Sequence, residues 1–156
     1  MNRKGNQKEL FRPQNRIDAA LVRMETSDLL LEKKRFSASI YFAGVAVECV
    51  LRAFIERDSK FFDEKHDLKK MSENSSIVPF FQDCDNMDDC FDRVIQYWDN
   101  KYRYTDDVKL MTFYRSRGLV THSKIRNENV LKSFASQCND AANVIVSRGF
   151  DLFYGA

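Results

Sequence analysis

Arg117 and His122 are the pair of residues in this chain whose types and spacing best suit phosphodiester chemistry, with four residues between them. A histidine gives or takes a proton near neutral pH, while an arginine neutralises the charge that builds on a phosphorane. Together they form a minimal set for cleaving RNA without a metal ion. Because the chain has 13 arginines in 156 residues, such a spacing also arises by chance, and a charged surface is the alternative interpretation.

Basic residues surround this pair. Between Lys101 and Arg126 there are seven lysines and arginines but two aspartates, a local excess of +5, whereas the whole chain has a formal net charge of +2. Such a patch can hold a phosphate backbone. We therefore expect contacts with RNA or phosphate from five side chains: Lys101, Arg103, Arg115, Lys124 and Arg126.

No motif in the sequence indicates a bound metal ion or cofactor, and we expect neither. The sequence has no C-x-x-C, no H-E-x-x-H and no Gly-rich phosphate loop, and its two histidines, His66 and His122, lie far apart. The acidic run at residues 83–89 lacks the central glycine and closing glutamate of an EF-hand. We interpret this run as the solvated start of a helix.

The elements that must position these residues are helices. With 5 glycines and 2 prolines, the chain has too few turn residues for a sandwich or a barrel. We predict an all-α fold, an antiparallel bundle of four to five helices over residues 16–156, preceded by a basic tail at residues 1–15. Apolar residues recur with helical spacing in five segments, around residues 17–31, 37–57, 87–98, 106–117 and 131–149, with a loop at 59–81 that contains a short helix at 67–71.

Length and composition suit one domain in the cytoplasm. Hydrophobic residues make up 44% and charged residues 31% of the chain, which is the balance of a globular protein. The first 16 residues lack the apolar core of a signal peptide, and the longest apolar stretch, at residues 40–47, is too short to span a bilayer. We expect no membrane association and four reduced cysteines, Cys49, Cys84, Cys90 and Cys138.

Several stretches together resemble the HEPN family of small all-helical proteins, which includes toxins, nucleotidyltransferase partners and defence nucleases. Residues 41–53 are similar to the family's second helix, with its Ala-x-Glu-x-x-Leu-Lys/Arg-Ala pattern, and His66-Asp67-Leu68 matches the tripeptide that follows it. Residues 98–104 are similar to a Trp…Arg-Tyr element of some members, and residues 117–122 resemble the Arg-x4–6-His motif. In order and spacing, the likeness covers roughly residues 16 to 150.

This resemblance implies a metal-independent ribonuclease site for single-stranded RNA, of the toxin or defence type, at the interface of a two-fold homodimer. Arg117 is then expected to stabilise the phosphorane, His122 to act as general acid and base, and Glu48 to orient one of them. A nucleotidyltransferase-type antitoxin is an expected partner. The chain departs from the family pattern at Gly118, where an asparagine is usual, and at Lys124, where a tyrosine is frequent.

Other interpretations remain open from the sequence. The protein is alternatively a catalytically inactive HEPN module that binds a nucleotide, a nucleic acid or a nucleotidyltransferase partner, and a purely structural helical adaptor is a third class. Glu48 alternatively forms an exposed i,i+4 pair with Arg52, and His66 is interpreted as structural, capping or bracing its loop. Four aromatic residues suit either stacking on bases or the core: Tyr97, Trp98, Tyr102 and Tyr104.

Overall fold

The computed structural model describes residues 12–59, 65–120 and 127–155, and in these ranges the chain forms helices and turns without a strand. The all-α prediction is therefore confirmed for this part of the chain. The described elements, with η for a 3₁₀ helix, are α2 (Pro13–Glu32), α3 (Phe36–Asp58), α4 (Leu68–Ser72), η1 (Ser75–Ile77), α5 (Val78–Phe81), α6 (Met87–Tyr97), η2 (Asn100–Tyr104), α7 (Asp107–Ser116) and α8 (Asn127–Tyr154).

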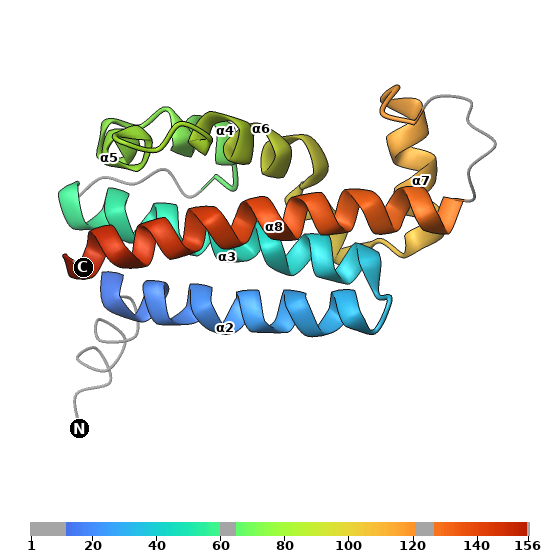
Figure 1. Cartoon of the computed structure of the whole chain (residues 1–156), viewed down its shortest axis with the longest axis horizontal. Helices are drawn as coiled ribbons and strands as arrows, with labels where there is room; N and C mark the ends of the chain where they lie inside the picture. The colour runs from blue at the N-terminus through green and yellow to red at the C-terminus, as the bar shows by residue number, and fades with distance from the viewer. Residues whose placement is uncertain (1–11, 60–64, 121–126, 156) are drawn as a thin grey trace.

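Three long helices, α2, α3 and α8, lie side by side with their axes nearly aligned (Figure 1). A tight turn at residues 33–35 makes α2 and α3 antiparallel. Helix α8 runs in the same direction as α3, because the intervening chain returns to the end of the molecule where α3 begins (Figure 1). The α3–α8 pair thus departs from the expected antiparallel arrangement. Helices α4, α5 and α6 cover the side of α3 and α8 away from α2, and α7 stands across one end.

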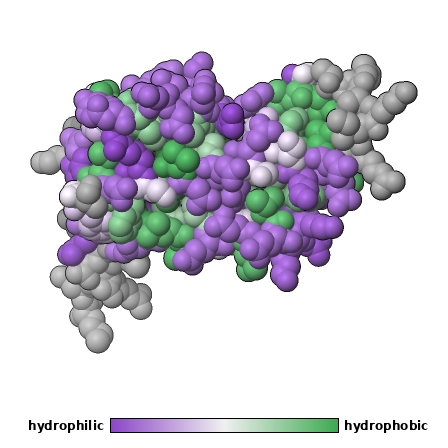
Figure 2. Space-filling model, viewed as in Figure 1, coloured by the Kyte–Doolittle hydropathy of each residue, from purple (hydrophilic) through white to green (hydrophobic). Residues whose placement is uncertain are grey.

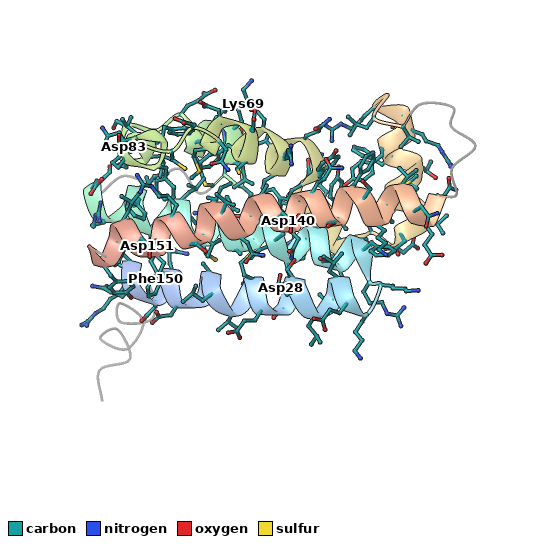
Figure 3. The ribbon with its side chains drawn as sticks, in the orientation of Figure 1. Asp28, Lys69, Asp83, Asp140, Phe150 and Asp151 are labelled. Atoms are coloured by element: carbon teal, nitrogen blue, oxygen red, sulfur yellow. The ribbon has the colours of Figure 1, made fainter. Side chains whose placement is uncertain are left out.

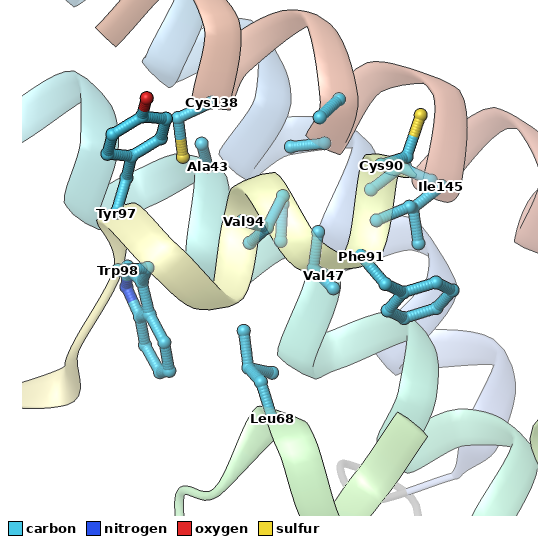
Figure 4. Close-up of a cluster of buried hydrophobic side chains, with 14 of the residues drawn as sticks. Ala43, Val47, Leu68, Cys90, Phe91, Val94, Tyr97, Trp98, Cys138 and Ile145 are labelled. Atoms are coloured by element: carbon cyan, nitrogen blue, oxygen red, sulfur yellow. The ribbon is translucent and has the colours of Figure 1, made fainter. Parts of the chain in front are cut away.

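Helix α3 is the centre of the hydrophobic core. It is apolar on nearly all sides, which is typical of a buried helix, and Val47 and Leu51 are fully buried as the helical spacing predicted. Its Gly44 lets Trp98 approach the backbone, since a Cβ there would lie 2.1 Å from the indole ring. The Trp98 Nε1–H donates to the Tyr41 carbonyl at 3.0 Å, and the indole ring lies at one side of a buried apolar cluster (Figure 4).

Helix α3 is also the one helix of the described residues that is long and apolar enough to cross a membrane. However, 72% of its most apolar window is buried inside the protein. This burial is what a central core helix requires. The location of the protein in the cell stays a prediction.

Local sequence signals predicted several helix boundaries to within one residue. Helix α3 was expected at residues 37–57, α6 at 87–98 and α7 at 106–117, close to the observed bounds. Asp106 caps α7 by accepting a hydrogen bond from the Lys109 backbone N–H at 2.8 Å. In the next position, Asp107 Oδ1 accepts from the Ser37 backbone N–H at 2.8 Å, which joins the start of α7 to the start of α3.

Other boundaries were wrong. Helix α2 begins at Pro13, so residues 13–15 are helical and not part of a tail, because proline is favoured in the first turn of a helix. Helix α8 continues past Gly149, where we expected it to end, and reaches Tyr154. A Cβ at Gly149 would lie 2.2 Å from Val50 Cγ1, so this glycine allows α8 to approach α3 closely. The loop at residues 59–81 also contains η1 and α5.

A buried polar network that the sequence analysis missed joins α2, α3 and α8. Ser27 Oγ donates to the Ser39 carbonyl, and Ser39 Oγ donates to the Ser27 carbonyl, both at 2.9 Å. Asn139 Nδ2 donates to Ser27 Oγ at 2.9 Å and to Asp28 Oδ1 at 2.8 Å. Asp28, labelled in Figure 3, also accepts from Asn143 Nδ2 at 3.2 Å. These bonds satisfy buried polar groups, which would destabilise the folded protein if they had no hydrogen-bond partner.

Candidate functional site

Arg117 lies at the C-terminal end of α7, where the backbone forms a Schellman motif. The Leu119 N–H donates to the Tyr114 carbonyl and the Gly118 N–H donates to the Arg115 carbonyl, both at 3.0 Å. Gly118 has a φ of +72°, a left-handed conformation that glycine adopts without strain. Gly118 therefore ends α7, as expected, and fixes the backbone beside Arg117.

The Arg117 side chain is exposed and contacts neutral groups. Its Nη1 donates to the Gln96 carbonyl at 3.2 Å and to the Tyr102 hydroxyl at 3.4 Å. The guanidinium carbon lies 5.8 Å from the centroid of the Phe113 ring. No carboxylate of the described residues forms an ion pair with it. The positive charge of Arg117 is therefore available to an external anion.

Three other predicted phosphate-binding residues are exposed in the same part of the chain. Lys101 and Arg103 belong to η2, and the Arg103 guanidinium stacks on the Tyr104 ring at 4.7 Å from its centroid. Arg115 lies in the last turn of α7, and its Nη2 donates to Asn127 Oδ1 at the start of α8. His122, Lys124 and Arg126 lie outside the described residues, so their positions relative to Arg117 stay predictions.

The aromatic residues near this surface divide into two groups. Tyr97, Trp98 and Tyr102 are buried and belong to the core. Tyr104, in contrast, is 76% exposed, and Phe113 on α7 is also exposed. Figure 2 shows apolar side chains gathered on the surface around α7. The side chains at this end thus offer both cations and aromatic faces to a ligand.

Glu48 lies elsewhere, in the middle of α3, and it is 6% exposed. Its Oε1 accepts a hydrogen bond from Arg52 Nε at 2.6 Å and lies 2.6 Å from His66 Nδ1. The i,i+4 pair with Arg52 therefore exists, but it is buried and not exposed as the alternative interpretation assumed. No contact joins Glu48 to Arg117, although both residues lie in the described part of the chain.

His66 braces the segment before α4 against α3 through Glu48. Because its Nδ1 lies against a carboxylate oxygen, that nitrogen carries the proton and Nε2 faces away. The side chain is 49% exposed and lines a hollow of about 310 Å³. Asp67, and not His66, caps α4 by accepting from the Lys70 backbone N–H at 3.1 Å. These contacts fit the structural interpretation of His66.

Burial governs the acid–base properties of the buried tyrosine and cysteine side chains. Desolvation raises the pKa of Tyr102, and the opposing effect of Arg117 is smaller, so the phenol is protonated at neutral pH. Burial likewise raises the pKa of Cys138 to about 12, and burial together with Glu48 raises that of Cys49. Neither of these two cysteines is a thiolate nucleophile at neutral pH. Within the described ranges, no three His, Cys, Asp or Glu side chains group as metal ligands.

Sequence reasoning missed Tyr102 as a partner of Arg117. The signal present in the sequence was the alternation of basic and aromatic residues at 101–104, which does not indicate which ring turns inward. The structure thus joins Arg117 to Tyr102, which lies in the same 3₁₀ helix as the exposed Lys101 and Arg103, and no hydrogen bond or ion pair of the described residues links Glu48 to Arg117. No family model, curated protein or solved structure matches the chain.

Proposed function

We propose that this protein is a HEPN-type endoribonuclease that cuts single-stranded RNA without a metal ion or cofactor. The observation that carries the proposal is the exposed Arg117 guanidinium, which contacts two neutral oxygens and one ring among the described residues. An arginine without a carboxylate partner attracts phosphate and stabilises the charge that develops on it. The proposal includes a HEPN-like bundle of four to five helices for the domain as a whole.

The proposed RNA path follows the exposed cations around Arg117. Exposed Tyr104 and Phe113 offer faces on which unpaired bases can stack, and such stacking is independent of base identity. A duplex keeps its bases inside and cannot use these faces, so a single strand is the better substrate. Five side chains are proposed to hold the phosphate backbone: Lys101, Arg103, Arg115, Lys124 and Arg126.

The proposed reaction is an internal transesterification. The ribose 2′-oxygen attacks the adjacent phosphorus, a new O–P bond forms, and the bond from phosphorus to the leaving 5′-oxygen breaks. His122 is proposed to move the proton from the 2′-OH or to the leaving oxygen, and Arg117 to stabilise the phosphorane. The products are a 2′,3′-cyclic phosphate and a 5′-OH end. Glu48 has a structural role in this proposal, because Arg52 and His66 both contact its Oε1.

The proposal extends to assembly. A second copy of the chain, related by two-fold symmetry, would bring another Arg117 and His122 to the same cleft. A nucleotidyltransferase-type antitoxin is the proposed partner of such a toxin. Size-exclusion chromatography with light scattering tests the homodimer, and a monomer at micromolar concentration would remove this part of the proposal.

Cleavage of a labelled single-stranded RNA in EDTA tests the activity. We expect 2′,3′-cyclic phosphate ends from the wild type, a rate about 10²–10⁴-fold lower for His122→Ala, and a lower kcat with little change in RNA affinity for Arg117→Ala. Arg115→Ala is the matched control, since it should weaken RNA binding and leave the chemistry intact. Activity that EDTA abolishes, or an Arg117→Ala variant with the kcat of the wild type, would contradict the proposal.

The inactive-module interpretation gives a different outcome. If the wild type cleaves no RNA across varied sequences but binds a nucleotide, an uncut RNA or a nucleotidyltransferase, that interpretation replaces the ribonuclease. The same protein preparations serve for both measurements, so the two functions are separated directly.

A further inference from the structure

We propose that the Tyr102 hydroxyl and the Arg117 guanidinium form one oxyanion site, in which Tyr102 donates a second hydrogen bond to the phosphate that Arg117 attracts. The two groups come from different elements, η2 and the end of α7, and the Arg117 Nη1 to Tyr102 hydroxyl distance is 3.4 Å. Identifying that phosphate as part of an RNA backbone rests on the proposed function. The site itself rests on the contacts of these two residues.

The hydrogen-bonding capacity of Tyr102 supports its role as a second donor to the phosphate. A phenol has one O–H to donate and lone pairs that accept. Arg117 Nη1 donates to this oxygen and so occupies a lone pair. Among the residues that the structure describes, none accepts the Tyr102 O–H, and none accepts from Arg117 Nε or Nη2. A phosphate, with several acceptor oxygens, matches these unused donors.

The tyrosine is rigidly held, which makes its hydroxyl a pre-organised donor. The residue is 4% exposed, and its ring meets the edges of Phe113 and Tyr114 at centroid distances of 5.7 and 6.1 Å. Asp99 caps η2 by accepting from the Lys101 N–H at 2.8 Å, which fixes the turn that carries Tyr102. A donor that is fixed before the charge develops stabilises it without a reorganisation cost.

Neighbouring groups leave this donor free and protonated. The Tyr114 hydroxyl is directed elsewhere, since it donates to the Tyr97 carbonyl at 2.6 Å. Burial raises the pKa of Tyr102, so its oxygen keeps the proton at neutral pH despite the nearby guanidinium. The negative charge of Asp99 also raises the pKa of Tyr102, and Asp99 Oδ1 already accepts a hydrogen bond from the Lys101 backbone N–H.

The test compares Tyr102→Phe with Tyr154→Phe, a control that removes a hydroxyl from an exposed tyrosine at the C-terminal end of α8. Binding of inorganic phosphate to the whole protein is measured by NMR titration of the Gly118 amide. We expect Tyr102→Phe to weaken phosphate binding about tenfold or more, as for loss of a hydrogen bond to a charged group. Arg117→Gln should abolish binding of inorganic phosphate, although RNA, which the five proposed backbone-binding side chains also hold, should lose little affinity. Tyr154→Phe should bind phosphate like the wild type.

RNA cleavage gives a second readout that a merely structural role would not change. If the wild type cleaves RNA, Tyr102→Phe should lower kcat about tenfold or more, with a smaller change in KM and an unchanged melting temperature. Equal phosphate affinity and equal kcat for Tyr102→Phe and the wild type would overturn this inference and leave the ribonuclease standing. Phosphate binding that depends on Tyr102, in a wild type that cuts no RNA, would remove the ribonuclease and leave the oxyanion site. A wild type that binds no phosphate would overturn the site.

Discussion

Arg52 and Arg117 lie in two regions that each contain a residue expected to take part in catalysis, Glu48 in the first and Arg117 itself in the second, but the surroundings of the two arginines differ. Arg52 is buried in α3, where it donates to Glu48, and His66 contacts the same carboxylate oxygen. Arg117 is exposed at the end of α7 and meets neutral oxygens. Residue type was therefore a poor guide to role. What separates the two regions is whether a carboxylate of the described residues already pairs with the arginine.

Physical chemistry explains this division. A buried charge is costly unless an opposite charge and hydrogen bonds compensate it, so the charges around Glu48 hold the fold together. An exposed charge is solvated and needs no partner, so Arg117 can exchange water for a ligand anion at little cost. The comparison predicts that changes in the Glu48 region alter stability, whereas changes around Arg117 alter binding and catalysis.

The largest expected effect on stability is that of Glu48→Ala. This substitution breaks the buried ion pair between Glu48 and Arg52, which typically costs about 3–5 kcal/mol. Arg117→Ala should change the free energy of unfolding by less than about 0.5 kcal/mol, as is usual for exposed positions. Urea denaturation of both variants measures the difference. The double variant Glu48→Met with Arg52→Leu is the control, and it should recover most of the loss. Equal destabilisation by the two single alanine substitutions would break the comparison.

A smaller loss is expected from Gly118→Ala. The left-handed φ of +72° costs a residue with a Cβ about 1–2 kcal/mol, although the structure leaves open space at this position. Gly118→Asn should lose less, because asparagine tolerates this conformation at a helix C-terminus. Thermal denaturation gives the stability, and RNA cleavage shows whether the backbone beside Arg117 has moved. An alanine variant as stable as the wild type would argue against the observed turn.

The free energy of unfolding should also depend on alkaline pH, through the buried Cys138 thiol of α8. The Cys138 thiol has a pKa of about 12 in the folded protein and about 9 when unfolded. The unfolded state therefore loses this proton first, and the stability contribution present below pH 9 is lost as pH rises towards 12, by about 1.4 kcal/mol per unit. Cys138→Ala should show a shallower decline in denaturant midpoint between pH 8 and 10.5. Parallel declines in the two proteins would show that the thiol is not shielded.

The smallest expected effect concerns the exposed cations around Arg117. If Arg103 and Arg115 each contact one phosphate, alanine at either position should lower the slope of log affinity against log salt by about 1. The control is Arg57→Ala. Arg57 is exposed in the last turn of α3, whereas α7 packs against the start of that helix, so its loss should leave the slope unchanged. Fluorescence anisotropy with a short single-stranded RNA, at several salt concentrations, measures these slopes. An equal decrease for all three variants would mean that binding is spread over the whole surface.

Part of the candidate site was predictable from local sequence, because local signals act over a few residues. Asp106 and Gly118 mark the two ends of α7 by capping and by a left-handed turn, so the position of Arg117 at the helix end followed from neighbouring residues. The choice between Arg52 and the proposed catalytic pair, Arg117 and His122, as the partner of Glu48 could not be made this way. Both choices were consistent with the chain, and burial of α3 selected the first.

The sequence alone determined the all-α class, the main helices and the burial of Val47 and Leu51, since helical periodicity and capping are encoded within each segment. The tertiary structure alone decided which groups meet. Tyr102 contacts Arg117 because η2 and the end of α7 pack together. Gly149 lies inside α8 and does not end it, because α3 packs so closely there that a Cβ would collide with Val50. Contacts of this kind depend on how helices distant in sequence pack, and no local pattern specifies that packing.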